Sequence, residues 1–166
     1  MRRTLILSVL FTGLAQSAAW ADESGMEFFE KRVRPLAQSL GSDFILPCDV
    51  GLDPGDPGPA SLSSTFRVLA ERWPTIDFVV HAIAFSDKNE LKGRYAATTR
   101  ENFTRTMLIS CFSFTELARL AAPLMTNGGG AMVTLTYGGS MRVMPNYNVM
   151  GVAKAALEAS VRYLAA

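Results

Sequence analysis

Tyr147 and Lys154 are the residues whose types and spacing best suit chemistry. They stand seven positions apart, about two helical turns, so on a helix they would share one face with Met150 between them. The phenol can donate a proton, and a nearby ammonium favours its ionised form. Such a pair suits a site where hydride adds to a conjugated carbonyl compound and the enolate is protonated. On spacing alone, an ordinary amphipathic border is the more frequent explanation.

The composition is that of one compact domain. The chain has 166 residues, 49% of them hydrophobic and 19% charged, with a net charge of +1. This length is enough to bury a core. A nucleic-acid-binding protein would show an excess of basic residues, so the near-zero net charge argues against that class. Cys48 and Cys111 lack the spacing of metal ligands, so we expect buried thiols and no metal site. The single histidine, His81, lies in an apolar run and is expected to be a hydrogen-bonded strand residue.

The first 21 residues allow two interpretations. Two arginines, an apolar stretch and an A-x-A sequence ending at Ala21 form the three parts of a secretory signal. Residues 3–10 also suit a buried first strand of a nucleotide-binding sheet. The apolar stretch is too short to span a bilayer. A degenerate first strand with its nucleotide loop and a signal peptide both remain open.

The rest of the chain alternates between helical and strand patterns. Amphipathic spacing predicts helices over residues 27–40, 61–73, 98–125 and from 147 onwards. Gly41 should end the first of them, and Thr98 and Glu101 have the spacing of a capping box at the start of the third. Apolar runs predict a short strand over residues 43–50 and buried strands over residues 76–83 and 131–136. This alternation predicts an α/β fold with a parallel sheet and right-handed crossovers.

Residues whose side chains could bind a ligand or transfer a proton lie at the ends of these strands. Asp49 lies at the end of one strand, and Tyr137 directly follows another. Ligands of open α/β sheets bind at the carboxyl edge of the strands. This position favours a functional role for Tyr137 and Tyr147, whereas Asp49 on its own is more often a turn residue.

Three segments carry a resemblance to a known family. Residues 43–50, 77–86 and 135–154 closely resemble the NADH-dependent enoyl-acyl-carrier-protein reductases of bacterial type II fatty acid synthesis, members of the short-chain dehydrogenase/reductase superfamily. The Tyr-x6-Lys spacing is specific, because ordinary members of the superfamily use Tyr-x3-Lys. The resemblance implies an α/β fold with an incomplete Rossmann-like doubly wound parallel sheet, in one partial domain over residues 1–166.

The resemblance also implies a reaction, in which hydride from NADH reduces the trans-2 double bond of an enoyl thioester. Tyr147 would hydrogen-bond the thioester carbonyl oxygen and stabilise the enolate. Lys154 would hold the hydroxyls of the nicotinamide ribose and keep the local field positive. Tyr137 matches the family's second tyrosine, near the acyl end of the site.

The remaining site residues are likewise implied by the resemblance. Asp49 and Val50 match the pair that contacts the adenine of NADH, and Ile83 matches a residue whose backbone lies against the cofactor ribose. Ser86 falls where the family binds substrate through a small residue, usually alanine. The family implies enoyl-acyl-carrier-protein as substrate, a homotetramer and a cytoplasmic location, with export through residues 1–21 as the alternative.

Two departures from the family pattern lead us to expect a truncated enzyme. Gly13 is the one glycine where the family has its phosphate-binding loop, and the family's next helix and strand, which need roughly 20 residues, have no room before residue 30. The sequence stops at Ala166, before the family's next strand and covering loop. Turnover is therefore doubtful, and a non-catalytic remnant that serves as an assembly or interaction module is the alternative.

Overall fold

The computed structural model describes residues 4–7, 27, 29–42, 44–52, 58, 60–125 and 129–166. The chain divides into two compact units, and each is described by itself. The larger unit comprises Met1–Gly13 and Trp73–Ala166, and the smaller unit is Leu14–Arg72.

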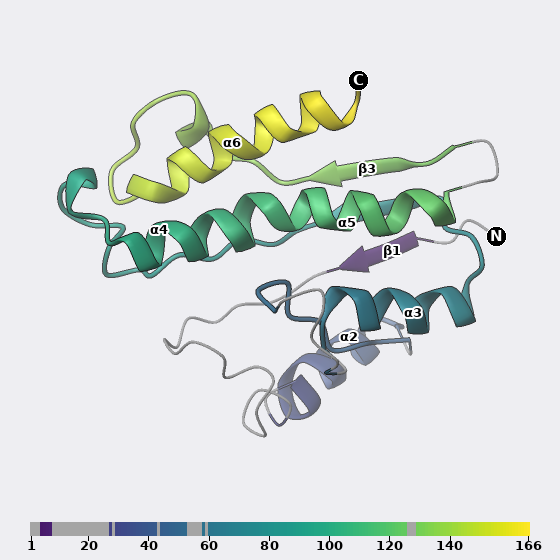
Figure 1. The fold of residues 1–166 in the computed structure, drawn as a ribbon. Coiled ribbons are helices and arrows are strands. Elements are labelled where there is room, and N and C mark those ends of the chain that lie inside the picture. The colour runs from purple at the N-terminus through teal and green to yellow at the C-terminus, as the bar shows by residue number, and fades with distance from the viewer. Residues whose placement is uncertain are drawn as a thin grey trace. The chain divides into compact units, whose positions relative to one another are not determined.

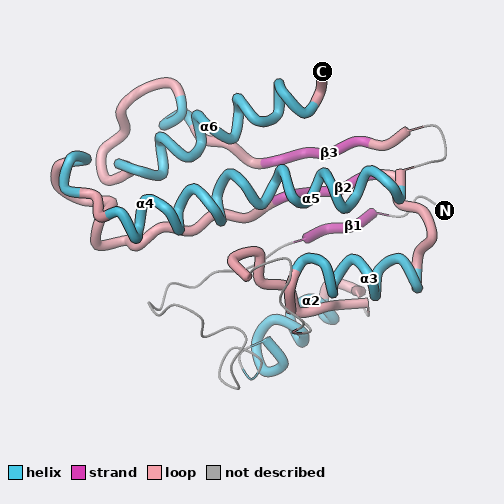
Figure 2. The backbone as a smooth tube through the Cα atoms, viewed as in Figure 1, coloured by secondary structure: helices cyan, strands magenta, loops and turns pink. Residues whose placement is uncertain are grey.

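A three-stranded parallel sheet forms one layer of the larger unit (Figures 1 and 2). Its strands are β1 (Thr4–Leu7), β2 (Phe78–His81) and β3 (Ala131–Thr134), in the order β1-β2-β3. The register pairs the last residues of all three strands, so they end at one edge. The predicted parallel sheet is confirmed. At the N-terminus the structure contains the predicted strand over Thr4–Leu7, and the rest of residues 1–21 lies outside the described residues.

β3 is more exposed than the predicted buried strand. Val133 and the following Leu135 are 51% and 55% exposed. Within the described residues β3 pairs with β2 on one side only, and an edge strand buries less of its side chains than a central one. The expectation that residues 131–136 are buried was therefore wrong.

One long helical stretch packs on the sheet and on the last helix. α4 (Arg100–Met107), the π-helical turn η3 (Leu108–Phe112), α5 (Ser113–Ala121) and the 3-10 turn η4 (Ala122–Leu124) follow without a break. α6 (Asn148–Leu164) contacts three of these elements, and Cys111, Phe114 and Leu157 form a buried cluster between them. The predicted helix over residues 98–125 is thus present.

This stretch is long and apolar enough, by length and composition, to cross a membrane. It nevertheless buries a row of polar side chains inside the unit. Those side chains belong to Asn102, Thr106, Ser110, Ser113 and Glu116. A helix whose polar groups are buried against other parts of the protein has the character of a core helix, so we interpret it as one.

The start of α4 differs from the predicted capping box. Thr99 is the N-cap residue, and its hydroxyl accepts the N–H of Asn102 at 3.2 Å. The Glu90 carboxylate accepts the backbone N–H and the hydroxyl of Thr99, at 2.9 and 2.8 Å. A carboxylate from the preceding loop therefore satisfies the helix start, in place of the predicted Glu101, and the prediction that Thr98 is the cap was wrong.

The smaller unit contains η1 (Phe29–Val33), α2 (Arg34–Ser39) and α3 (Leu62–Arg72). Gly41 follows α2 with a φ of 83°, as predicted for a residue that ends a helix. The helices predicted over residues 27–40 and 61–73 are confirmed in outline. The single domain over residues 1–166 stays a prediction.

The strand predicted over residues 43–50 is absent from the part of that segment which the structure describes. Residues 44–49 belong to no strand. Arg34 Nη1 donates to the carbonyl of Ile45 at 3.2 Å, and Thr65 Oγ1 donates to that of Pro47 at 3.2 Å. Pro47 has no N–H to donate to a neighbouring strand, and the carbonyls of Ile45 and Pro47 accept hydrogen bonds from side chains instead of from a strand. The prediction of a strand here was therefore wrong.

His81 at the end of β2 is buried and hydrogen-bonded, as predicted. Its Nδ1 lies 2.8 Å from Thr134 Oγ1, and its Nε2 lies 2.9 Å from Ser113 Oγ. Because the Ser113 hydroxyl donates to the carbonyl of Ile109 at 2.7 Å, it accepts from the imidazole. Nε2 therefore carries the proton, and Nδ1 accepts from Thr134. Burial, and secondly the charge of Lys154, lower the pKa of His81 to about 4.

We predict that this neutral imidazole makes folding pH-dependent. Between about pH 4 and pH 6.5 the unfolded chain binds the proton that folded His81 excludes, so stability falls as the pH falls. The free energy of unfolding should drop by about 2 kcal/mol between pH 7.5 and pH 5. Urea denaturation across this range measures the drop. His81→Gln removes the titrating group and should flatten the profile; an unchanged slope in this variant would contradict the assignment.

Candidate active site

Two tyrosines meet beyond the carboxyl end of β3. Tyr137 follows the strand, Tyr147 immediately precedes α6, and their ring centroids are 4.9 Å apart with the planes inclined at 58°. Burial raises the pKa of Tyr147, and the neighbouring Tyr137 raises it further. The sequence had suggested that an ammonium would favour the ionised phenol. In the structure both influences favour the protonated phenol, so Tyr147 keeps its proton at neutral pH and can act as a hydrogen-bond donor.

Tyr147 occupies the N-cap position of α6 and does not lie on the helical face. Its φ and ψ are −125° and −24°, and the next residue, Asn148, has a φ of 26°. The carbonyl of Tyr147 accepts the N–H of Met150 at 2.9 Å. Of the three residues predicted to share one helical face, only Met150 and Lys154 lie on the helix, and both are buried. Tyr147 is placed by the start of α6, as its N-cap residue.

Lys154 is buried where α6 faces the end of β3. Its side chain donates from Nζ to the carbonyl of Leu135 at 2.7 Å, and the residue is 5% exposed. Burial lowers the pKa of the ammonium. An ammonium has three N–H donors, so the bond to Leu135 leaves donors that could serve a ligand. Lys154 thus fastens α6 to the segment that carries Tyr137.

Two glycines, which the sequence analysis did not single out, permit close packing around Tyr147. A Cβ on Gly139 would lie 2.4 Å from Cδ1 of the Tyr147 ring, and a Cβ on Gly151 would lie 2.8 Å from the carbonyl oxygen of Gly139. Any larger residue at either position would collide with a neighbour. Gly139 and Gly151 lie two and four residues after Tyr137 and Tyr147, and this nearness in the sequence is the signal that could have found them.

Ile83 and Ser86 follow β2 towards the same edge of the sheet. Ile83 is 3% exposed. The Ser86 hydroxyl accepts from Thr106 Oγ1 at 2.9 Å and from Asn102 Nδ2 at 3.2 Å. The Ser86 side chain therefore bonds to α4, and this role in holding the loop was not predicted.

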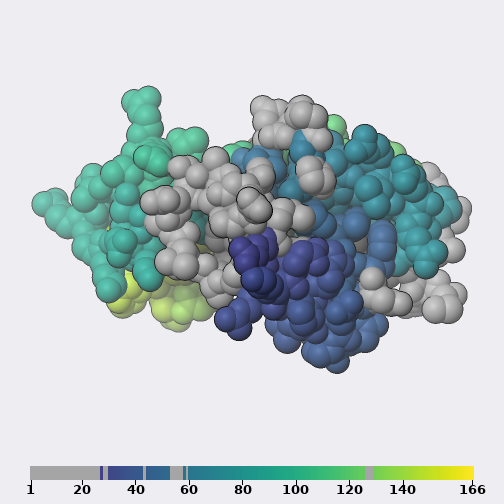
Figure 3. All heavy atoms as spheres, turned by 90° about the horizontal axis from the view of Figure 1, so that it is seen from below, coloured from purple at the N-terminus to yellow at the C-terminus, as the bar shows by residue number. Residues whose placement is uncertain are grey.

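Asn148 connects this loop to the tyrosines. Its Nδ2 donates to the carbonyl oxygens of Glu90 at 3.1 Å and Lys92 at 3.2 Å. The residues that begin α4 and the residues before α6 lie at the same end of the larger unit (Figures 1 and 3). The residue after Tyr147 therefore ties the two connecting segments together, another contact that the sequence did not reveal.

Asp49 and Val50 belong to the smaller unit. Asp49 Oδ1 accepts the N–H of Gly51 at 2.8 Å, a local bond that aspartate commonly makes in turns. Burial raises the pKa of Asp49, and Val50 is 3% exposed. The structure thus shows the turn role of Asp49, and the contact of both residues with adenine stays a prediction.

Comparison with known proteins identifies the class. The sequence model of a family described as "Enoyl-(Acyl carrier protein) reductase" matches residues 17–166. The chain is 66% identical over 152 residues to enoyl-[acyl-carrier-protein] reductase [NADH] 2 of Rhizobium meliloti, covering 92% of this chain and 54% of that protein. It is 55% identical over 139 residues to the FabI enzyme of Rickettsia bellii, covering 84% of this chain and 50% of that protein.

Solved structures agree with this class. The enoyl-acyl-carrier-protein reductase of Anaplasma phagocytophilum, crystallised in complex with NAD, matches with a TM-score of 0.81 and 49% identity, covering 99% of this chain and 64% of that one. FabI of Candidatus Liberibacter asiaticus matches with a TM-score of 0.79 and 50% identity, covering 99% and 65%. The predicted Rossmann-like fold with a partial sheet is confirmed. The chain belongs to the enoyl-acyl-carrier-protein reductase family, and it spans about half the length of the curated relatives it matches.

We predict that Gly139→Ala is destabilising because its Cβ would collide with the Tyr147 ring. The loss in the free energy of unfolding should be about 1 to 3 kcal/mol, measured by urea denaturation. Gly138→Ala is the matched control, since nothing lies within 4 Å of the added Cβ, and it should change stability by less than about 0.5 kcal/mol. Equal effects of the two substitutions would contradict the packing described here.

Proposed function

We propose that this site reduces the trans-2 double bond of enoyl-acyl-carrier-protein thioesters with hydride from NADH, in fatty acid biosynthesis. The observation that carries the proposal is the protonated Tyr147 against Tyr137 at the carboxyl edge of a parallel sheet, where the buried Lys154 donates to the carbonyl of Leu135, two residues before Tyr137. The family to which the chain belongs supports it, because the relatives' names specify NADH and the acyl carrier protein.

Tyr147 supplies the donor that this reaction needs. NADH, when bound, supplies hydride to the β-carbon of the substrate, and negative charge then develops on the thioester oxygen. A phenol placed to donate to that oxygen stabilises the developing charge. Since burial raises the pKa of Tyr147, the proton is present at neutral pH and stays on the phenol until the oxygen becomes basic.

We propose that residues of the larger unit hold the nicotinamide ribose of the dinucleotide. The bond from Lys154 to Leu135 uses one N–H of the ammonium, and its other donors suit the hydroxyl pair of the nicotinamide ribose. Ile83 would contact that ribose through its backbone. Asp49 and Val50 would contact the adenine. Because the Ser86 hydroxyl bonds to α4, substrate would meet Ser86 through its backbone or Cβ.

The assembly and location follow from the same proposal. A homotetramer would cover Phe103 and Phe112 of the long helical stretch, which are 38% and 49% exposed. A reaction that consumes NADH takes place where the reduced dinucleotide is available, so we propose the cytoplasm. Export through residues 1–21 is the alternative, and the N-terminal mass of the mature protein distinguishes the two.

A non-catalytic assembly module is the second candidate. Apolar side chains exposed around and beyond β3 favour it, with Val133, Met141 and Val143 at 51%, 87% and 99%. Exposed apolar side chains that gather into a patch are often used in association. Light scattering combined with an NADH titration separates the candidates, because oligomers that bind no NADH would favour the module.

The reductase proposal predicts that Tyr147→Phe lowers the turnover number at least about 100-fold, since it removes a donor to the developing charge. NADH oxidation with a crotonyl thioester measures this, and NADH affinity should be unchanged. Tyr163→Phe is the matched control, because Tyr163 is 86% exposed, and it should behave as wild type. Full activity in Tyr147→Phe would contradict the role of Tyr147, and a wild-type chain that binds no NADH would contradict the function.

A further inference from the structure

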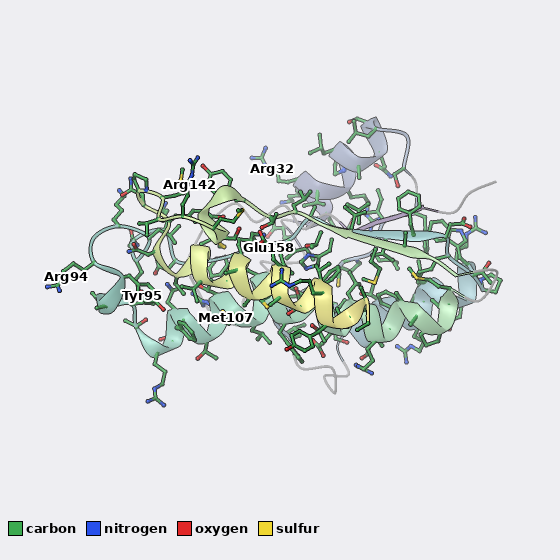
Figure 4. The ribbon with its side chains drawn as sticks, turned by 90° about the horizontal axis from the view of Figure 1, so that it is seen from above. Arg32, Arg94, Tyr95, Met107, Arg142 and Glu158 are labelled. Carbon is green, nitrogen blue, oxygen red and sulfur yellow. The ribbon has the colours of Figure 1, made fainter. Side chains whose placement is uncertain are left out.

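Two successive turns of α6 hold the segment that leaves β3. Lys154 Nζ donates to the carbonyl of Leu135 at 2.7 Å. One turn later, Glu158 Oε1 accepts from Thr136 Oγ1 and from Ser140 Oγ, both at 2.5 Å. Figure 4 shows Glu158 on the side of α6 that faces this segment. Residues 135–140 are thus bonded to α6 at three points.

The two bonds to Glu158 bracket Tyr137. Thr136 precedes the tyrosine, and Ser140 lies at the far end of the turn that the tyrosine begins, where the Ser140 N–H donates to the Tyr137 carbonyl at 2.9 Å. Between them, Gly139 lies directly against the Tyr147 ring. A single carboxylate oxygen therefore closes the turn that sets the position of Tyr137.

The charge of Glu158 suits this function. The hydroxyl of Ser140, and then that of Thr136, lower the pKa of Glu158, so the carboxylate is ionised at neutral pH. Hydrogen bonds to an ionised acceptor are shorter and stronger than those between neutral groups. The bond from Lys154 fixes the end of β3 but not the turn after Tyr137, which depends on Glu158.

We propose that Glu158 is a positioning residue of the site, whose carboxylate holds Thr136 and Ser140 and through them keeps Tyr137 against the ring of Tyr147. This inference rests on the proposed reductase function. Glu158 acts through the turn and not on the substrate. Its loss should therefore change the arrangement of the two rings and the rate of turnover, and leave NADH binding unchanged.

Four variants of the full chain test the proposal by kinetics. Glu158→Ala should lower kcat about tenfold, because small displacements of positioned groups slow catalysis strongly, while KM for NADH stays within about twofold. Glu158→Gln should remain within about threefold of wild-type kcat, since its amide oxygen can accept both hydroxyls. Thr136→Val with Ser140→Ala removes the donors and should match Glu158→Ala. Glu101→Ala, an exposed carboxylate on α4, is the control and should match wild type.

Adding Glu158→Ala to the Thr136→Val and Ser140→Ala pair should lower kcat no further, because the three side chains act as one unit. Additive losses, or Glu158→Gln as impaired as Glu158→Ala, would overturn the proposal. If Glu158→Ala fails to fold, the variant lacking the two hydroxyls decides, since it keeps the carboxylate.

Ring contacts provide a readout that does not depend on activity. In protein labelled on its tyrosine rings, nuclear Overhauser effects between Tyr137 and Tyr147 should be present in wild type, Glu158→Gln and Glu101→Ala. They should disappear in Glu158→Ala and in the variant without the two hydroxyls. Their persistence in these two variants, or their absence from wild type, would overturn the proposal. A wild-type chain that shows the ring contact and no turnover would refute the reductase function alone.

Discussion

The buried ammonium of Lys154 requires an acceptor, and the carbonyl of Leu135 provides it at 2.7 Å. A buried charge without a partner would be strongly destabilising at the 5% exposure of Lys154. The structure therefore keeps α6 in the position against the end of β3 that allows this bond. The position of α6 in turn sets where its N-cap residue, Tyr147, meets the end of β3. The bond from Lys154 to a backbone atom thus links the core of the unit to the geometry of its site.

The charge of Lys154 also affects β2, the central strand of the sheet. It lowers the pKa of His81 in addition to the effect of burial, so β2 carries a neutral imidazole that bridges β3 and α5 through hydroxyls. Burial also favours the neutral form of the Tyr147 phenol, in this case by raising its pKa. At neutral pH the unit therefore combines the ammonium of Lys154, the protonated phenol of Tyr147 and the neutral imidazole of His81. This division of charge suits chemistry in which negative charge appears only during the reaction.

Local patterns in the sequence predicted the elements well, and tertiary contacts account for the failures. The apolar run at β2 and the glycine after α2 are signals contained in a few neighbouring residues. The strand expected at residues 43–50 failed because its carbonyls bond to Arg34 and Thr65, which no local pattern reveals. The cap at Thr99 depends in the same way on Glu90. Type and position predicted Tyr137, Tyr147 and Lys154 as site residues, and the structure brings the two tyrosine rings together. Gly139 and Glu158 could not be predicted, because they matter only through the packing of Gly139 against Tyr147 and the bond of Glu158 to Ser140.

The row of buried polar side chains on the long helical stretch has an evolutionary consequence. Asn102 accepts the backbone N–H of Asp87, and Ser110 bonds to both backbone groups of Phe85. Each residue in a helix turns the chain by about 100°. Insertion or deletion of a single codon between Asn102 and Ser110 would rotate one of these two side chains away from the loop that contains Phe85 and Asp87. An apolar neighbour would take its place. Homologous chains should therefore vary in the composition of this helix while keeping its length between these two positions.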